Sequence, residues 1–156
     1  MKILKLIISV AICLAVGGGA SIFTVSSISN WYQFLQKPAF NPPNWIFSPV
    51  WTTLYILMGI SLFLIWSNKE KTKRRKWFLI IFILNLVLNF FWSMIFFYWQ
   101  QPGWAFLEII PLALSILILI ILGWKISKPA SWLLVPYFLW VSFASVLNFS
   151  IWFLNK

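Results

Sequence analysis

The sequence has no histidine, one cysteine and two acidic residues, and only 9% of its residues are charged. Without histidine, the usual protein ligand sets for zinc and haem iron cannot be formed. Glu70 and Glu108 are the only carboxylic side chains, which excludes Ser-His-Asp catalysis and catalysis by paired carboxylates. Cys13 has no second cysteine to pair with, so the chain has no disulfide framework.

The residues that are abundant are apolar ones, which make up 62% of the sequence, and 21% of all residues are aromatic. Long apolar runs in a chain of 156 residues predict a single all-α domain, residues 1–156, that is integral to the membrane. A formal charge of +10 would suggest nucleic-acid binding in a soluble protein. Here, however, six of the twelve basic residues lie in one short tract, Lys69–Lys76, between two apolar runs. This pattern is typical of a cytoplasmic loop, so we expect the lipid bilayer and no nucleic acid as a partner.

The apolar runs predict a bundle of five transmembrane helices. Lys2 and Lys5 before the first run also resemble the start of a secretory signal, but the run continues past the small residues of a cleavage site, which favours a retained span. In this run Ala11, Ala15 and Gly19 recur every four residues, a spacing that allows another helix to approach, either within the bundle or in a dimer. The expected spans are residues 3–25, 49–66, 77–99, 104–124 and 130–154.

The segment between the first two spans, residues 26–48, is predicted to be an aromatic lid rather than a flexible linker. Three prolines prevent a continuous helix there, because proline lacks an N–H group and restricts the residue before it. The segment also contains many aromatic residues, which a solvated linker would not need. Ser48 and Pro49 are predicted to begin the second helix, as its N-cap and its first helical residue.

The distribution of basic residues predicts how the chain crosses the membrane. With five spans and a cytoplasmic Lys69–Lys76 tract, only Lys37 and Lys156 lie on the other side. The ten cytoplasmic basic residues are then those of the tract together with Lys2, Lys5, Lys125 and Lys128. We therefore expect a multi-pass protein of a bacterial cytoplasmic membrane with a cytoplasmic N-terminus, and with the lid and the C-terminus on the opposite side.

Polar and aromatic side chains share one face of the third span. Asn85 and Asn89 are one turn apart, and Trp92 and Phe96 continue the same face. Amide groups within hydrocarbon must find partners or line a wet cavity. These two amides therefore either bond to neighbouring helices or contact a ligand.

The fifth span has a second face of this kind. Its members are Tyr137, Trp140, Ala144, Leu147 and Asn148. Two such faces beneath a lid predict an amphiphilic pocket with apolar walls, a few polar groups and aromatic surfaces suited to a flat ligand. Glu108, about one turn into the fourth span, is expected near the outer interface, where it either bonds locally or contributes to the mouth of the pocket.

Three separated motifs resemble those of the TspO/MBR family, the tryptophan-rich sensory proteins of bacteria, which are similar to the mitochondrial translocator protein. The motifs are WYQFLQKPAFNPPNWIFSPVWTTLY from Trp31, LNFFWSMIFF from Leu88 and PYFLWVSFASVLN from Pro136. The resemblance covers essentially all five spans. It implies a five-helix bundle, a homodimer, and binding of porphyrins or other tetrapyrroles without any required cofactor.

The resemblance also implies which residues contact the ligand. From the first two helices and the lid they are Ser21, Thr24, Tyr32, Pro42 and Trp51. From the third and fifth helices they are Asn85, Asn89, Trp92, Phe96, Trp140, Ala144 and Leu147. Trp51 and Trp140 match tryptophans implicated in the light-dependent degradation of protoporphyrin by some bacterial members, and they would be the catalytic residues of such a reaction.

Two departures limit what the resemblance implies. The mammalian cholesterol motif needs a tyrosine where this chain has Phe149, which argues against sterol binding. Some bacterial members dimerise through small residues of the third span, whereas residues 80–91 contain none. A dimer of this chain would need bulky aliphatic packing instead.

Three functions follow from these observations: a tetrapyrrole-binding protein for porphyrin handling or stress sensing, a light-dependent porphyrin-degrading enzyme, and a transporter of small amphiphiles. Because histidine is absent, recognition would depend on ring stacking and hydrogen bonds, and we expect metal-free protoporphyrin to bind at least as well as haem. Coupled transport is disfavoured, because five spans give no inverted repeat and no charged coupling residue is predicted at mid-depth.

Overall fold

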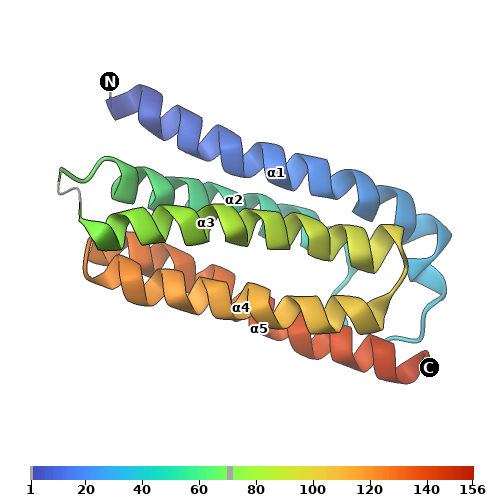
Figure 1. The fold of residues 1–156 in the computed structure, drawn as a ribbon. Helices are drawn as coiled ribbons and strands as arrows, with labels where there is room; N and C mark the ends of the chain where they lie inside the picture. The colour runs from blue at the N-terminus through green and yellow to red at the C-terminus, as the bar shows by residue number, and fades with distance from the viewer. Residues whose placement is uncertain (1, 70–71) are drawn as a thin grey trace.

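The computed structural model describes residues 2–69 and 72–156, which form a bundle of five long helices (Figure 1). The helices are α1 (Lys2–Asn30), α2 (Asn44–Trp66), α3 (Lys73–Ser93), α4 (Pro102–Trp124) and α5 (Lys128–Leu154). A π-helical turn, Met94–Tyr98, extends α3, and a 3-10 turn, Tyr32–Phe34, follows α1. All five helices are long and apolar enough to cross a membrane. The predicted all-α, five-span fold is confirmed.

The helices differ in how deeply they are packed. α1 lies along one side of the bundle, mainly against α2 and in part against α3 (Figure 1). α4 packs most extensively on α5, which also packs on α2. In α1, 17% of the most apolar stretch is buried, against 33% in each of the other four helices. α1 is therefore the peripheral helix, and most of its surface is left for lipid.

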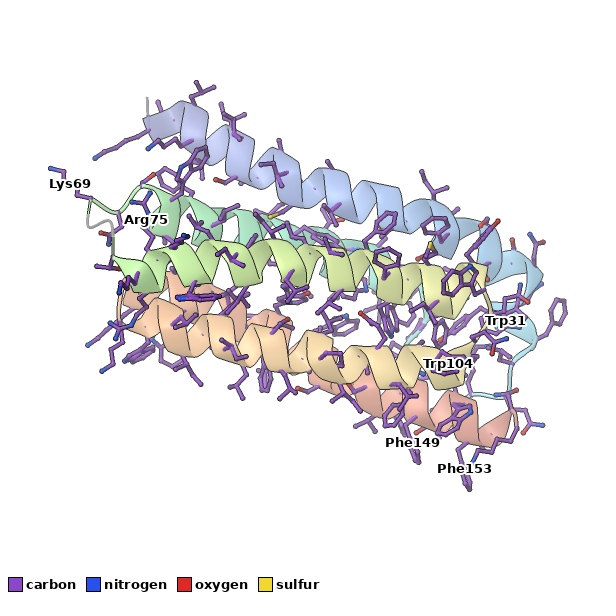
Figure 2. The ribbon with its side chains drawn as sticks, in the orientation of Figure 1. Trp31, Lys69, Arg75, Trp104, Phe149 and Phe153 are labelled. Atoms are coloured by element: carbon purple, nitrogen blue, oxygen red, sulfur yellow. The ribbon has the colours of Figure 1, made fainter. Side chains whose placement is uncertain are left out.

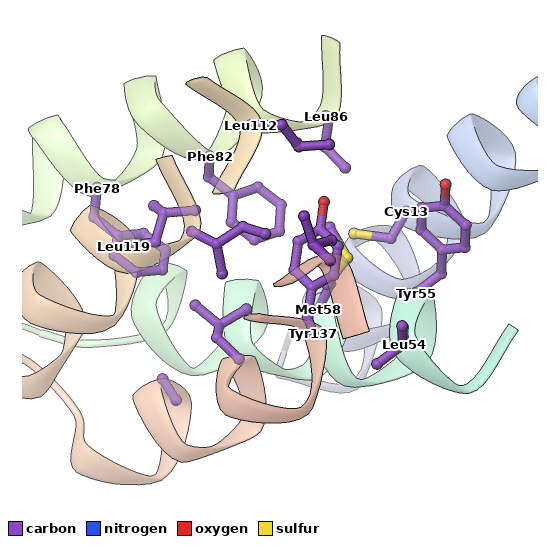
Figure 3. Close-up of a cluster of buried hydrophobic side chains, with 14 of the residues drawn as sticks. Cys13, Leu54, Tyr55, Met58, Phe78, Phe82, Leu86, Leu112, Leu119 and Tyr137 are labelled. Carbon is purple, nitrogen blue, oxygen red and sulfur yellow. The ribbon is translucent and has the colours of Figure 1, made fainter. Parts of the chain in front are cut away.

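A continuous apolar core fills the space between α2, α3, α4 and α5, and α1 contributes Cys13 to it (Figure 3). Phe78 and Phe82 stack within it, with ring centroids 6.0 Å apart. A second, smaller cluster lies under the lid and contains Tyr32, Phe96 and Leu147. In hydrocarbon, close packing rather than exclusion of water drives helix association. The lid thus has an apolar cluster of its own that joins it to the bundle.

The lid is shorter than the predicted 26–48, because both flanking helices extend into it. α1 continues to Asn30 and α2 begins at Asn44, which leaves residues 31–43 as the lid. α3 also begins earlier than expected, at Lys73. There the hydroxyl of Thr72, the N-cap residue, accepts a hydrogen bond from the backbone N–H of Arg75 at 3.2 Å.

The prediction that Ser48 caps α2 was wrong. Pro43 is the N-cap residue, and Pro49 lies within the first two turns of the helix. The added first turn contains Phe47, which packs edge-to-face against Trp140 of α5 with ring centroids 6.2 Å apart. The helix therefore starts before the residue that the local sequence predicts, and its additional turn makes a tertiary contact.

The clustered basic residues at the start of α3 and the lid lie at opposite ends of the bundle. Figure 2 shows Lys69 and Arg75 at one end and Trp31 and Trp104 at the other. The Arg75 guanidinium donates to the backbone carbonyl of Trp66 at 2.8 Å, which ties the start of α3 to the end of α2. The predicted orientation contrasts the basic tract around Arg75 with Lys37 in the lid and Lys156 after α5. These two sets of charges are therefore separated along the folded bundle.

The close approach of α1 and α2 depends on a glycine of α2. A β-carbon on Gly59 would lie 2.5 Å from the Cα atom of Val10 in α1. Of the small residues whose spacing allows another helix to approach, Ala11 and Ala15 are exposed, and Gly19 faces Phe90 of α3. The two helices touch at backbone distance because Gly59 has no side chain.

We expect Gly59→Ala to destabilise the protein by roughly 1–3 kcal/mol, because the added methyl group would overlap the backbone of α1. Gly18→Ala is the matched control, since a β-carbon there meets no heavy atom within 4 Å and alanine favours helix. Unfolding in detergent, followed by circular dichroism, measures both variants. Equal stability of the two would contradict the close contact at Gly59.

Candidate ligand-binding site

Two side-chain interactions hold the lid in one conformation. Tyr32, which is 3% exposed, donates its hydroxyl to Asn41 Oδ1 at 2.8 Å. Asn155, which follows α5, donates its amide to the carbonyl of Gln36 and accepts from the N–H of the same residue, each at 2.9 Å. Burial raises the pKa of Tyr32 to about 12, so its hydroxyl remains a hydrogen-bond donor at neutral pH. The lid is therefore a fixed loop joined to the end of α5.

Beneath the lid lies a central cavity with largely aromatic walls and a volume of about 60 Å³. Trp92 and Phe96 stack in its wall with ring centroids 5.4 Å apart. The residues that line it are Thr24, Tyr32, Phe47, Trp51, Trp92, Phe96, Phe97, Trp140, Ala144, Leu147, Asn148 and Ile151. Such walls suit a flat apolar ring system, which can stack on some rings and meet others edge-on.

A larger cleft, of about 300 Å³, lies between α1 and α2 beside the central cavity. Thr24, Phe47 and Trp51 line both spaces. Ser21 lines the cleft, but its hydroxyl donates to a backbone carbonyl of α1 at 2.7 Å. The cavity and the cleft are thus adjoining spaces that share part of one wall.

The structure brings together most of the residues predicted to bind a ligand. Ser21 lines the adjoining cleft, whereas Pro42, Asn85 and Asn89 line neither space. Those that line the central cavity are Thr24, Tyr32, Trp51, Trp92, Phe96, Trp140, Ala144 and Leu147.

Sequence reasoning missed Phe47, Phe97, Asn148 and Ile151 as lining residues. Asn148 was assigned to the correct face of the fifth span but not to the ligand set. Ile151 could have been found, because it lies one turn beyond Leu147 on that face. Phe47 had no such signal, since its helical turn was assigned to the lid.

Asn85 and Asn89 form the centre of a buried hydrogen-bond network that joins four helices. Asn89 accepts a hydrogen bond from the Tyr55 hydroxyl of α2 and donates to the Tyr137 hydroxyl of α5 at 2.9 Å. Tyr137 donates to Asn85 Oδ1 at 3.2 Å, and Asn85 donates to the Ser115 hydroxyl of α4 at 2.8 Å. Figure 3 shows the rings of Tyr55 and Tyr137 among the buried residues. Both amides thus form interhelical bonds, which is one of the two roles that the sequence left open.

Trp92 and Trp140 differ in what their indole N–H groups contact. Trp92 donates to Asn148 Oδ1 at 3.1 Å, and the Asn148 amide donates to the carbonyl of Pro102 at 2.7 Å. The Trp140 N–H is buried, yet it has no hydrogen-bond partner among residues 2–69 and 72–156. A buried donor without a partner is costly. Trp140, which lines the cavity, therefore carries a donor that the described part of the protein does not use.

These features define a multi-pass membrane protein with an aromatic internal cavity beneath a folded loop. The profile of the TspO/MBR family matches residues 9–153, and the chain belongs to that family.

Similar proteins match over most of their length. The tryptophan-rich protein TspO of Archaeoglobus fulgidus is 44% identical over 155 residues, which cover 99% of each chain. The translocator protein of Ovis aries is 39% identical over 124 residues, 78% of this chain and 73% of that protein. Protein CrtK of Rhodobacter capsulatus is 34% identical over 143 residues, 92% of this chain and 88% of that protein. The family that the three motifs indicated is confirmed.

We expect Tyr137→Phe to destabilise the protein by roughly 1–3 kcal/mol, because both Asn85 and Asn89 would lose a partner in apolar surroundings. Tyr98→Phe serves as the control, since it removes a hydroxyl from a side chain that is 66% exposed. Thermal unfolding in detergent compares the two variants with the wild type. If Tyr137→Phe unfolds at the wild-type temperature, the network does not stabilise the bundle.

Proposed function

We propose that this protein binds a tetrapyrrole, such as protoporphyrin, in the central cavity and the adjoining cleft, and that it acts in porphyrin handling or stress sensing. The observation that carries this proposal is the set of aromatic walls that includes Trp140, whose buried N–H has no partner among residues 2–69 and 72–156. Aromatic walls stack on a flat conjugated ring, and a single donor in such a wall can orient its polar edge.

The size of the cavity determines how such a ligand would fit. Ligand cavities usually have volumes of roughly 300–1,000 Å³, well above the central cavity alone. The adjoining cleft supplies about 300 Å³ more. Phe47 and Trp51 lie between the two spaces and line both. The ligand would therefore occupy both spaces after one or both of these side chains move.

The lid supplies a cation for an acidic ligand. The Lys37 ammonium group lies 4.8 Å from the centre of the Tyr32 ring, and Tyr32 lines the cavity. A porphyrin carries propionate groups at one edge of an apolar ring, so this arrangement suits a ligand whose carboxylates face the lid. No histidine is available to ligate iron, which supports recognition of the ring itself.

The orientation in the membrane follows from the same charges. We infer that the end with Arg75 and the other clustered basic residues is cytoplasmic, and that the lid and the end of α5 lie on the opposite side of the cytoplasmic membrane. A ligand would then reach the lid from outside the cytoplasm or reach the cleft from the bilayer.

We expect Trp140→Phe to weaken protoporphyrin binding by about threefold to tenfold, because the variant keeps an aromatic ring but loses the donor. Its stability should change little, since this N–H has no partner among the described residues. Trp132→Phe, at a side chain of the same helix that is 61% exposed, is the matched control.

The measurement is a titration of purified protein with protoporphyrin and, separately, with haem, followed by the porphyrin absorption band. Saturable binding of protoporphyrin at least as tight as that of haem is expected. Absence of saturable binding to the wild type would refute the proposed function, and equal affinities of the two variants would remove Trp140 from the site.

A light-dependent porphyrin-degrading activity is a second candidate, favoured by the position of Trp51 and Trp140 on the same cavity. Trp51 also contacts Tyr55 and Tyr137, with ring centroids 5.7 and 6.3 Å away. The bound ligand would absorb the light, so the reaction needs no general acid, general base or metal from the protein.

Illumination of the protoporphyrin complex in air tests this activity. We expect the porphyrin band to fade faster in the wild type than in Trp51→Phe or Trp140→Phe, when compared at equal ligand occupancy. Trp132→Phe should fade as the wild type does. Equal fading in all four proteins would leave binding, without turnover, as the function.

A further inference from the structure

The start of α3 carries two lysine side chains that the described part of the protein leaves without a partner. Lys73 and Lys76 are exposed, and neither forms a hydrogen bond, an ion pair or a ring contact with residues 2–69 or 72–156. Glu108 is the only acidic side chain among those residues, and it lies near the start of α4, at the lid end of the bundle. No described carboxylate therefore neutralises the two ammonium groups.

Both lysines line a cleft of about 490 Å³ on the surface of α3. Ile80 and Ile83, which line its other end, are 44% and 63% exposed. Ile83 lies about 10 Å beyond Lys76 along the helix axis. The cleft thus passes from a basic end to an apolar surface. Its full lining is Thr72, Lys73, Arg75, Lys76, Leu79, Ile80 and Ile83.

The basic end of the cleft lies at the level of the lipid headgroups. Trp77, next to Lys76, is 58% exposed, and exposed tryptophans and lysines at the end of a membrane-spanning helix mark the membrane–water interface. Figure 2 shows Arg75 at the same end of the bundle. The isoleucines lie deeper along the same helix, at the level of the acyl chains. The cleft therefore has the polarity profile of a phospholipid.

We propose that this cleft binds an anionic phospholipid, with its phosphate on Lys73 and Lys76 and its acyl chains along Ile80 and Ile83. Residues three apart on a helix are neighbours on its surface, so both ammonium groups can reach one phosphate. Such charge-assisted hydrogen bonds supply the anion that the described carboxylates do not. A choline headgroup would bring a further positive charge to the two lysines, which disfavours a zwitterionic lipid.

The other two polar residues of the cleft differ in what they can offer a phosphate. Arg75 adds positive charge, but its guanidinium already donates to the carbonyls of Trp66 and Asn68, at 2.8 and 3.1 Å. The Thr72 hydroxyl oxygen accepts the backbone N–H of Arg75 at 3.2 Å, and the hydroxyl donates to no described residue. Thr72 can therefore give the phosphate a third hydrogen bond. Replacing Arg75 would untie α3 from α2, so the two lysines are the residues to test.

This site is distinct from the proposed tetrapyrrole site. No described residue that lines the α3 cleft also lines the central cavity or the α1–α2 cleft. The two sites also lie at opposite ends of the bundle. Lipid binding can therefore be measured on the protein without a tetrapyrrole, and either proposal can fail without the other.

The test compares phosphatidylglycerol with phosphatidylcholine that carries the same acyl chains. Native mass spectrometry of the purified protein, titrated in detergent, gives a Kd for the first molecule of each lipid. We expect the wild type to bind phosphatidylglycerol about tenfold more tightly. The double variant Lys73→Gln/Lys76→Gln should reduce this preference to about twofold or less. The matched control, Lys125→Gln/Lys128→Gln, loses the same charge at the same end of the bundle and should keep the preference.

Equal Kd values of the two lipids for the wild type would overturn the proposal, and this comparison requires no variant. An equal loss of preference in both double variants would also overturn it, because selectivity would then depend on net charge rather than on this cleft. Glycerol phosphate, which has the phosphate but no acyl chains, should not displace the lipid; displacement would assign the lysines to a free phosphate instead. Both double variants should unfold at the wild-type temperature in detergent, which shows that they are folded.

Discussion

The hydrogen-bonded chain from Tyr55 through Asn89, Tyr137 and Asn85 to Ser115 is the interaction on which the bundle depends. In hydrocarbon no water is available to form hydrogen bonds with these groups, so each must keep its partner on a neighbouring helix. The chain thereby fixes the relative positions of α2, α3, α4 and α5. α1 takes no part in it and is the least buried helix. The network thus joins four helices, whereas α1 is held by packing and by the Lys5 ammonium group, which lies 5.4 Å from the centre of the Trp66 ring of α2.

The cavity and the cleft of the proposed binding site lie where the four joined helices meet α1. The α1–α2 cleft can widen by movement of α1 without breaking any bond of the network. The central cavity lies directly beside the network, because the ring of Trp51 lines it and also contacts Tyr55 and Tyr137. One side of the proposed site is therefore held by the network, whereas α1, on the other side, contributes no residue to that network.

Much of the fold was predictable from the sequence, because the length and apolar composition of a span do not depend on its neighbours. Helix ends were less predictable: the first turn of α2, with Phe47, extends into the predicted lid and packs on Trp140 from the fifth helix. Helical spacing placed Trp92, Phe96 and Trp140 on the correct faces. It could not separate a ligand-binding Asn89 from a structural one, since both roles need an amide on the same inward face. Spacing also shows only that a small-residue face can be approached, and in this structure α1 meets α2 closely at Gly17 and at Gly59.

The pairing of Asn155 with Gln36 joins residues that are 119 positions apart in the chain. During synthesis, the lid emerges after α1, but the side chain that fastens it emerges only after α5. This fastening of the lid can therefore form only after all five helices have been synthesised, whereas the contacts of Tyr32 with Asn41 and Phe96 join residues that emerge earlier.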